Sequence, residues 1–215
     1  MNNPDVVIID YGFGNILSVQ RGLEHCGAKV VLTADPKKIL TAKRVVLPGV
    51  GAFASAMQAL QSLSLVAVIR ELSERETPLL GICLGMQLLL DESDEFGLTA
   101  GLGLIPGRVI TVPDHTLTGK PQKIPHVGWA GLYPSHESVG WENTLLKNNC
   151  PGECAYFVHS FMAVPTEQSH RVADSFYGEH KIAVMIGRNQ ITGCQFHPEK
   201  SGEVGLKILR RFISG

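Results

Sequence analysis

A cysteine stands between two glycines at a point where a strand is predicted to give way to a helix. The segment reads Gly81-Ile82-Cys83-Leu84-Gly85, and it follows the apolar run Pro78–Ile82. It is a cysteine version of the G-x-S-x-G nucleophile elbow, a sharp turn that exposes its central side chain. A helix N-terminus stabilises a thiolate through its free N–H groups and its dipole. We therefore predict that Cys83 is a nucleophile; the alternative is a buried structural cysteine between helix-packing glycines.

A nucleophilic cysteine needs a base, and His197 is the best placed of the eight histidines. It stands in Gln195-Phe196-His197-Pro198-Glu199, directly after an apolar predicted strand. Side chains at i and i+2 of an extended segment point to the same side, so Glu199 should face His197 and stabilise its imidazolium. Pro198 should keep this link extended, because the residue before a proline avoids the helical region. The pattern predicts a triad of Cys83, His197 and Glu199, although a His-x-Glu pair alone would also fit an exposed surface pair.

A glycine-flanked loop, Leu47-Pro48-Gly49-Val50-Gly51-Ala52, follows another predicted strand. Such a loop at the carboxyl edge of a parallel sheet lies where ligands bind. Its backbone N–H groups could complete an oxyanion hole with the N–H of Leu84. The alternative is an ordinary strand-to-helix turn.

Two other patterns are not expected to bind a cofactor or a metal. Gly12-Phe13-Gly14 follows the first predicted strand, but Leu17 stands where a dinucleotide-binding loop needs its third glycine. Cys150 and Cys154, taken with His159, have a loose spacing that lacks the second pair of a zinc site. We expect no cofactor and no metal.

The first two-thirds of the chain is predicted to alternate between strands and helices, and these elements must position the residues named above. From Gly107 onward the predicted elements are short β-rich segments. The fold class is α/β, one domain over residues 1–215, with a mainly parallel central sheet, helices on both faces and a β-rich C-terminal extension. The predicted strands are Val6–Ile9, Val30–Leu32, Arg44–Leu47, Pro78–Ile82, Val109–Val112, Ala155–Val158, Arg171–Phe176, Ile182–Ile186 and Ile191–Phe196. The predicted helices are one that ends near Cys26, then Ala52–Leu60, Leu65–Arg75, Leu84–Leu90 and Gly202–Ile213.

Composition narrows the class of protein. The 215 residues are 44% hydrophobic and 18% charged with a formal net charge of -1, so neither disorder nor a general affinity for nucleic acid or anionic membranes is indicated. An odd number of cysteines, with no signal peptide expected, favours a reducing cytoplasm. The stretch from Val45 to Ile69 has no charged residue, yet its Pro, Gly, Gln and Ser content favours a strand, a turn and a helix over a membrane span.

Motifs at six places along the chain resemble the class I (triad) glutamine amidotransferases, in family order and over the full length. The elbow, the Gln195–Glu199 block and the Pro48–Gly51 loop carry the resemblance. Further matching segments are Asp10-Tyr11-Gly12-Phe13-Gly14-Asn15, Ile124-Pro125-His126-Val127-Gly128-Trp129, and Tyr156-Phe157-Val158-His159-Ser160. Within the family, the chain is similar to the branch that supplies ammonia to a cyclase in histidine biosynthesis.

The resemblance implies a glutaminase reaction. Cys83 would attack the side-chain amide of glutamine, and N–H groups of Leu84 and of the Val50-Gly51 loop would hold the oxyanion. His197 would protonate the leaving ammonia, and a γ-glutamyl thioester would then be hydrolysed to glutamate. By family position, the glutamine-binding residues are Gly49, Gly51, Gln87, His159, Ser160 and Phe161.

The resemblance also implies a partner in a heterodimer. Ammonia would pass to a (β/α)8-barrel cyclase subunit, which makes imidazole glycerol phosphate and aminoimidazole carboxamide ribotide. Tyr156 and Lys200 stand at positions that the family uses at this interface, and Asn15, Pro125 and Trp129 are expected near it. The chain departs from the family pattern at Ala130 and Leu17, which are both expected near that interface and bear on the identity of the partner.

Three functions of different classes stay open at this point. The first is the partner-dependent glutaminase, in histidine biosynthesis or as a paralogue that supplies ammonia for sugar amidination in surface-polysaccharide biosynthesis. The second is a stand-alone γ-glutamyl hydrolase, and the third is a non-catalytic binding module. The intact Cys83, His197 and Glu199 argue against the third, and the interface motifs argue against the second.

Overall fold

The computed structural model describes residues 4–135 and 140–215; Met1–Asn3, part of the segment in which no signal peptide is expected, lie outside them. The strands are β1 (Val6–Ile9), β2 (Val30–Thr33), β3 (Val45–Leu47), β4 (Leu79–Ile82), β5 (Glu92–Ser93), β6 (Thr99–Ala100), β7 (Gly107–Thr111), β8 (His126–Gly131), β9 (Tyr133–Pro134), β10 (Cys154–His159), β11 (Phe161–Pro165), β12 (Arg171–Tyr177), β13 (His180–Arg188) and β14 (Ile191–Cys194). The α-helices are α1 (Ile16–His25), α2 (Pro36–Leu40), α3 (Phe53–Ser62), α4 (Leu65–Glu74), α5 (Leu84–Leu88) and α6 (Gly202–Ser214), and the short 3-10 turns are η1 (Gln168–His170) and η2 (Pro198–Lys200).

One large sheet forms the centre of the molecule, with the strand order β2-β1-β3-β4-β14-β13-β11-β7-β5-β6. From β2 to β14 neighbouring strands are parallel, and from β14 through β13 and β11 to β7 they are antiparallel. β12 pairs with β13, and β8 with β10 forms a separate two-stranded ribbon. The predicted parallel sheet with a β-rich C-terminal extension is confirmed.

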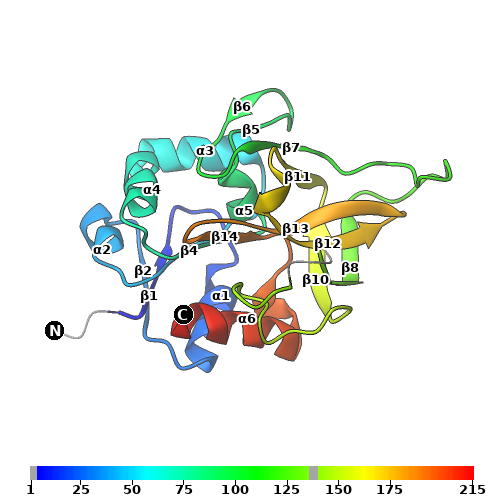
Figure 1. Cartoon of the computed structure of the whole chain (residues 1–215). Helices are drawn as coiled ribbons and strands as arrows, with labels where there is room; N and C mark the ends of the chain where they lie inside the picture. Colours follow the sequence, from blue (N-terminus) through cyan, green and yellow to red (C-terminus); the bar gives the residue numbers. More distant parts are fainter. Residues whose placement is uncertain (1–3, 136–139) are drawn as a thin grey trace.

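Helices cover both faces of the parallel half, as Figure 1 shows: α1 and α6 lie below the sheet, and α2, α3, α4 and α5 lie above it. The strand Val6–Ile9 is fully buried on both faces, which explains why its sequence is a continuous apolar run. One core cluster includes Phe53 of α3 and Leu65 of α4, and the other includes Leu23 of α1 and Phe212 of α6. The sheet therefore separates two hydrophobic cores and presents the carboxyl ends of its parallel strands at one edge.

The uncharged stretch from Val45 to Ile69 forms β3, a turn, α3 and the first part of α4. Within the described residues, no single helix has the length and apolar composition needed to cross a membrane. The helices α3 and α4 meet those criteria only when taken together, as a pair bent by 90°.

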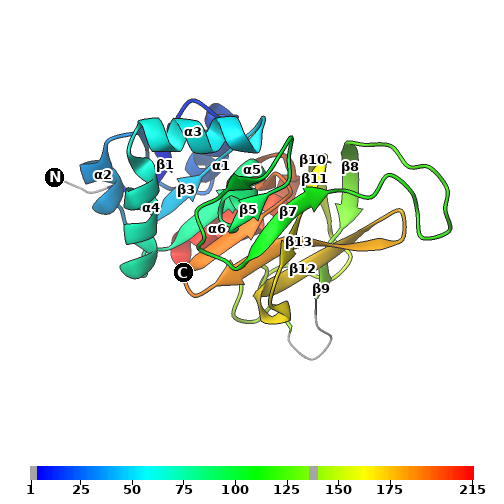
Figure 2. The same ribbon diagram turned by 90° about the horizontal axis from the view of Figure 1, so that it is seen from above.

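The ribbon of β8 and β10 has one buried and one exposed face. Tyr156 pairs with Trp129 and Val158 pairs with Val127, and these four side chains share one face. Trp129 is 58% exposed and Val127 56% exposed, whereas Phe157, on the opposite face, is buried in the core. The ribbon lies at the end of the molecule away from α2 (Figure 2).

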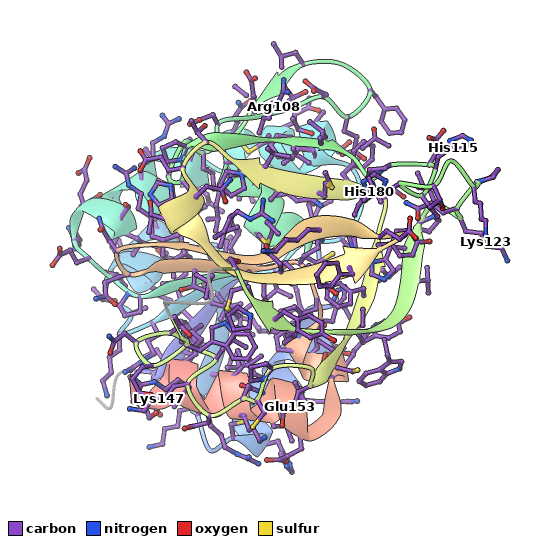
Figure 3. The ribbon with its side chains drawn as sticks, turned by 45° about the vertical axis from the view of Figure 1, so that its right-hand side comes forward. Arg108, His115, Lys123, Lys147, Glu153 and His180 are labelled. Carbon is purple, nitrogen blue, oxygen red and sulfur yellow. The ribbon has the colours of Figure 1, made fainter. Side chains whose placement is uncertain are left out.

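An arm formed by residues 113–123 projects from the body between β7 and β8 (Figure 2). The His180 ring nitrogen Nε2 lies 2.8 Å from the carbonyl oxygen of His115, and the N–H of Thr118 donates to Glu179 at 3.2 Å. Figure 3 shows His115 and Lys123 on this arm with His180 beside them. The turn between β12 and β13 and the first residue of β13 thus hold the arm, whose last residues lead directly to Pro125.

Candidate active site

Cys83 lies at the carboxyl end of β4, where the chain turns into α5. Its φ of 55° and ψ of -112° are values that a non-glycine residue adopts only under constraint. A Cβ atom on Gly85 would lie 1.9 Å from the carbonyl oxygen of Leu47, and one on Gly81 would lie 2.7 Å from that of Gly85. The two glycines therefore allow α5 to pack against the ends of β3 and β4, which is the geometry of the predicted nucleophile elbow.

The pocket in front of Cys83 has a volume of about 390 Å³. Its lining consists of Val50, Gly51, Cys83, Leu84, Gln87, Glu95, Pro125, Val158, His159, Ser160, Phe161 and His197. The predicted oxyanion and glutamine-binding residues come together here with one exception. Gly49 is buried outside this lining, packed close to the backbone of Gly85 and the hydroxyl of Tyr11.

His197 and Glu199 form a buried pair beside the cysteine. The ring nitrogen Nδ1 of His197 lies 2.8 Å from the Glu199 oxygen Oε1, and the two side chains are 3% and 0% exposed. Among the described residues, Nε2 of His197 has no hydrogen-bond partner. Burial lowers the pKa of His197, but the Cys83 sulfur and the Glu199 carboxylate raise it more, to about 9. The site is thus arranged for His197 to accept a proton from Cys83 and to carry it as an imidazolium.

The segment that links His197 to Glu199 has a different conformation from the predicted one. β14 ends at Cys194, His197 is extended, and residues 198–200 form the 3-10 turn η2. The prediction that Pro198 keeps the link to Glu199 extended is therefore wrong. The fixed φ of proline suits the first position of such a turn, and the turn brings Glu199 back to the His197 ring. Lys200 lies in η2 rather than in the final helix, which begins at Gly202.

Backbone hydrogen bonds attach His197 directly to the β8–β10 ribbon. The N–H of His197 donates to the carbonyl oxygen of Tyr156 at 3.0 Å. The hydroxyl of Ser201 accepts from the N–H of Tyr156 at 3.0 Å and donates to the carbonyl oxygen of His197 at 2.7 Å. A shift of β10 would consequently move the predicted catalytic base.

The loop after β3 is held at its start. The Tyr11 hydroxyl donates to the carbonyl oxygen of Pro48 at 2.8 Å, and burial raises the pKa of Tyr11 far above its usual value, so it stays a donor. Val50 is 42% exposed, and Gly51 has a φ of 101°. Tyr11 therefore holds the start of the loop, and Val50 and Gly51 line the pocket.

The imidazole ring of His159 is fully engaged with protein atoms. Its Nδ1 lies 2.8 Å from the carbonyl oxygen of Phe161, and its Nε2 lies 3.1 Å from Nδ1 of His126. A carbonyl oxygen only accepts, so the His159 proton is on Nδ1 and His126 donates to Nε2. Burial is the main cause that lowers the pKa of His159 to about 4, so the ring is neutral. The ring of His159 accordingly offers a ligand no free nitrogen.

Glu95 also lines the pocket, and the sequence analysis did not predict it as a site residue. It is 8% exposed, and its Oε2 accepts from the N–H of Phe53 at 2.6 Å. Within the described ranges, it is the one carboxylate of the pocket lining. It comes from the loop after β5, which carries no recognisable motif, so only the folded chain reveals it.

The predicted interface residues lie around the ribbon and the pocket. Trp129 and Tyr156 contact each other edge to face, with ring centroids 5.9 Å apart, on the exposed face of the ribbon. Pro125 lines the pocket, Asn15 directly precedes α1, and Lys200 is exposed in η2.

The two residues that depart from the family pattern, Leu17 and Ala130, differ in exposure. Leu17 is 62% exposed on α1. Ala130 neighbours Trp129 in the sequence, but it pairs with the buried Ala155 and packs against the core. The side chain of Ala130 therefore lies on the face of the ribbon opposite to Trp129, and its nearness to a partner stays a prediction.

The structure also describes the Gly12-Phe13-Gly14 segment and the Cys150/Cys154 pair, which were not expected to bind a cofactor or a metal. Phe13 stacks on Tyr11, with ring centroids 5.8 Å apart, and Cys150 and Cys154 are exposed free thiols. In the part of the chain that the structure describes, no group of three or more His, Cys, Asp or Glu side chains is arranged to hold a metal ion.

Residues 7–214 match the family model described as glutamine amidotransferase class-I. Over 208 residues the chain is 48% identical to imidazole glycerol phosphate synthase subunit HisH 1 of Legionella pneumophila (strain Lens), covering 97% of this chain and 98% of that protein. Over 207 residues it is 46% identical to subunit HisH of Geobacillus sp. (strain WCH70), covering 96% and 95%. The solved structure of PurLQS from Thermotoga maritima has the same fold, with a TM-score of 0.71, 17% identity and 98% of both chains covered.

Proposed function

The chain belongs to the class-I glutamine amidotransferase family, and we propose that it is the glutaminase subunit of an imidazole glycerol phosphate synthase. It hydrolyses glutamine to glutamate and ammonia, and a (β/α)8-barrel cyclase subunit uses the ammonia. Residues 1–215 act as one glutamine amidotransferase domain. The observation that carries the proposal is the buried His197–Glu199 pair facing the strained Cys83 in one pocket. The near full-length likeness to HisH subunits gives the pathway.

The pocket supports a two-stage reaction with a balanced proton path. The Cys83 proton moves to Nε2 of His197, and the sulfur attacks the amide carbon of glutamine. The N–H groups of Leu84 and of the Val50-Gly51 peptide stabilise the oxyanion. The C–N bond then breaks and ammonia leaves with the proton from His197. A water molecule gives a proton to His197 and its oxygen to the thioester, which releases glutamate and restores Cys83.

The pocket also contains groups that suit the rest of the glutamine molecule. Glu95 is a buried carboxylate that its hydrogen bond to Phe53 holds in place, so it can pair with the substrate's α-ammonium group. Gln87 donates with its NH2 group to protein atoms, which leaves its carbonyl oxygen to accept from the substrate amide. Ser160 and Phe161 complete this side of the pocket.

We expect Glu95→Gln to raise the KM for glutamine by about 10- to 100-fold while kcat falls much less. The amide keeps the shape and the bond to Phe53 but loses the charge that attracts the α-ammonium group, a difference of about 1.5–3 kcal/mol. Steady-state kinetics of the complex measure the KM and kcat, and Glu92→Gln on β5, close to Glu95 in the sequence, is the control. An unchanged KM for glutamine in Glu95→Gln would remove Glu95 from substrate binding.

The exposed face of the ribbon suits a protein partner. Val127, Trp129 and Val158 are 56%, 58% and 38% exposed and lie on one face with Tyr156. Contiguous exposed apolar surface marks an interaction site. We infer that the cyclase covers this face, because it adjoins the pocket from which ammonia must leave. All five cysteines are free, which suits assembly in the cytoplasm.

Lys200 is expected to contribute an ion pair to this interface. It is exposed, it lies beside the triad in η2, and it makes no ion pair with any residue in the ranges 4–135 and 140–215. Loss of one partner of a desolvated interface pair costs about 2–5 kcal/mol, so Lys200→Ala should weaken cyclase binding by about 30-fold or more. The stimulation of glutaminase by the partner should fall with it.

Titration calorimetry with the cyclase measures the Lys200→Ala effect, and Lys38→Ala on the exposed side of α2 is the matched control. The unfolding temperature of the isolated variant should stay within about 1–2 °C of the wild type, because no core contact is lost. Unchanged affinity together with unchanged stimulation would make Lys200 an ordinary solvated lysine and leave Tyr156 as the main candidate.

The proposed function is tested by glutamine hydrolysis with and without the cyclase and its nucleotide ligand. We expect strong stimulation by the loaded partner. High unaided turnover would instead indicate a stand-alone γ-glutamyl hydrolase. The sugar-amidination alternative draws no support from Ala130, whose side chain faces the core.

A further inference from the structure

Gln195 is brought beside the nucleophile by the register of two parallel strands. β14 pairs with β4 so that their last residues, Cys194 and Ile82, lie opposite each other. Gln195 directly follows β14, and Cys83 directly follows β4. The N–H of Cys83 donates to the carbonyl oxygen of Cys194 at 2.8 Å, and the N–H of Gln195 donates to that of Val184 at 2.9 Å. The side chain of Gln195 is fully buried.

The contacts of Gln195 settle which way its amide group points. The Gln87 nitrogen Nε2 lies 3.1 Å from the carbonyl oxygen of Phe161 and 2.9 Å from Oε1 of Gln195. A main-chain carbonyl can only accept, so the Gln87 atom that faces Phe161 must be its NH2 group. That NH2 group then needs an acceptor on Gln195. The NH2 group of Gln195 is consequently turned to the Cys83 sulfur, with Nε2 to Sγ at 3.7 Å.

A donor at this place favours the charged form of the sulfur. A buried thiolate is an anionic acceptor, and a hydrogen bond to a charged group is roughly twice as strong as one between neutral groups. Among the described residues, the carbonyl oxygen of Val158 also lies at hydrogen-bond distance, 3.9 Å from the sulfur, and this acceptor favours the protonated thiol instead. Burial raises the pKa of the neighbouring Cys194 well above its usual value, so that thiol stays neutral.

We propose that Gln195 is a further catalytic residue, whose NH2 group donates to the Cys83 sulfur whenever that sulfur carries negative charge. This happens twice in the reaction. Before attack, the thiol proton has moved to His197. In the second stage the C–S bond of the thioester breaks and its electron pair returns to the sulfur. The inference deepens the proposed function and rests on it, but the thiolate contact can be tested without glutamine or a partner.

The test is the alkylation rate of Cys83 as a function of pH in the full chain. Iodoacetamide reacts with the thiolate, so the rate reports the thiolate fraction. The exposed thiols are removed in a Cys150→Ser, Cys154→Ser background, and peptide mass mapping follows the modification of Cys83. Gln195→Met removes the donor at similar volume. Thr192→Val on the same strand, away from the pocket lining, is the control.

For Gln195→Met we expect alkylation of Cys83 at neutral pH to slow about tenfold, with the wild-type rate recovered at alkaline pH. The value of kcat in the complex should fall at least as much, with the KM for glutamine changed less than about threefold. Thr192→Val should match the wild type. Gln195→Glu keeps an oxygen for Gln87 but opposes the thiolate, so its alkylation should be slower still, and it serves if the methionine variant does not fold.

An alkylation profile that is the same in Gln195→Met, or in Gln195→Glu, as in the wild type would overturn the proposal and leave Gln195 as a structural partner of Gln87. A complex that hydrolyses no glutamine while the alkylation rates still change would contradict the proposed function and leave the thiolate contact intact.

Discussion

Replacing Cys83 with serine is expected to lower glutamine hydrolysis by about 10⁴-fold or more while the fold and the binding of the cyclase persist. A serine hydroxyl is a much weaker acid and nucleophile than a thiol, so the His197–Glu199 pair loses its nucleophile. The side chains are similar in size, so the packing at the elbow should hold. Glutamine hydrolysis by the complex, followed as glutamate release, measures the effect.

The Cys83→Ser complex should still make the cyclase product from free ammonium, because the acceptor chemistry belongs to the barrel subunit. Cys150→Ser, at an exposed free thiol, is the matched control and should keep full activity. If Cys83→Ser hydrolysed glutamine at a rate near the wild type, Cys83 would not be the nucleophile.

Glu199→Gln is expected to lower kcat by about 10²- to 10⁴-fold and to change the KM for glutamine little. Glu199 orients the His197 ring through the 2.8 Å contact at Nδ1 and helps to raise the pKa of His197 to about 9. An amide cannot stabilise the imidazolium in the same way, so the loss falls on the chemical steps. The pKa of His197 should also be lower in this variant, because the Glu199 carboxylate no longer offsets the lowering by burial.

Steady-state kinetics over a range of pH measure both effects of Glu199→Gln. Glu203→Gln, on the exposed first turn of α6, is the control for the loss of a carboxylate nearby. A change confined to the KM for glutamine would place Glu199 in substrate binding rather than in the triad.

Local patterns predicted the parallel half of the fold well. Val6–Ile9 forms the predicted strand residue for residue, because a strand buried on both faces must be a continuous apolar run. The helix Pro36–Leu40 was missed, since five residues give no period to detect, and so was β8, whose residues alternate between exposed and buried faces across a glycine. These elements depend on their neighbours more than on their own sequences.

Some residues of the candidate site could likewise be predicted from local patterns, and others could not. Cys83 and His197 stand in dense local motifs at strand ends, and the structure places them in one pocket as predicted. Local patterns do not disclose the places of Glu95 and Gln195. The register of β4 with β14 brings Gln195 to the sulfur, and the packing of a distant loop brings Glu95 to the pocket. The turn at Pro198 was misjudged because proline suits both an extended link and the start of a 3-10 turn.

The central claim is that Cys83 releases ammonia from glutamine for use inside the complex. The most direct measurement supplies glutamine with an isotopically labelled amide nitrogen, together with excess unlabelled ammonium, and analyses the imidazole product by mass spectrometry. We predict that the wild-type complex gives labelled product and that the Cys83→Ser complex gives only unlabelled product. Product from the wild-type complex labelled no more than the ammonium in solution would contradict the account.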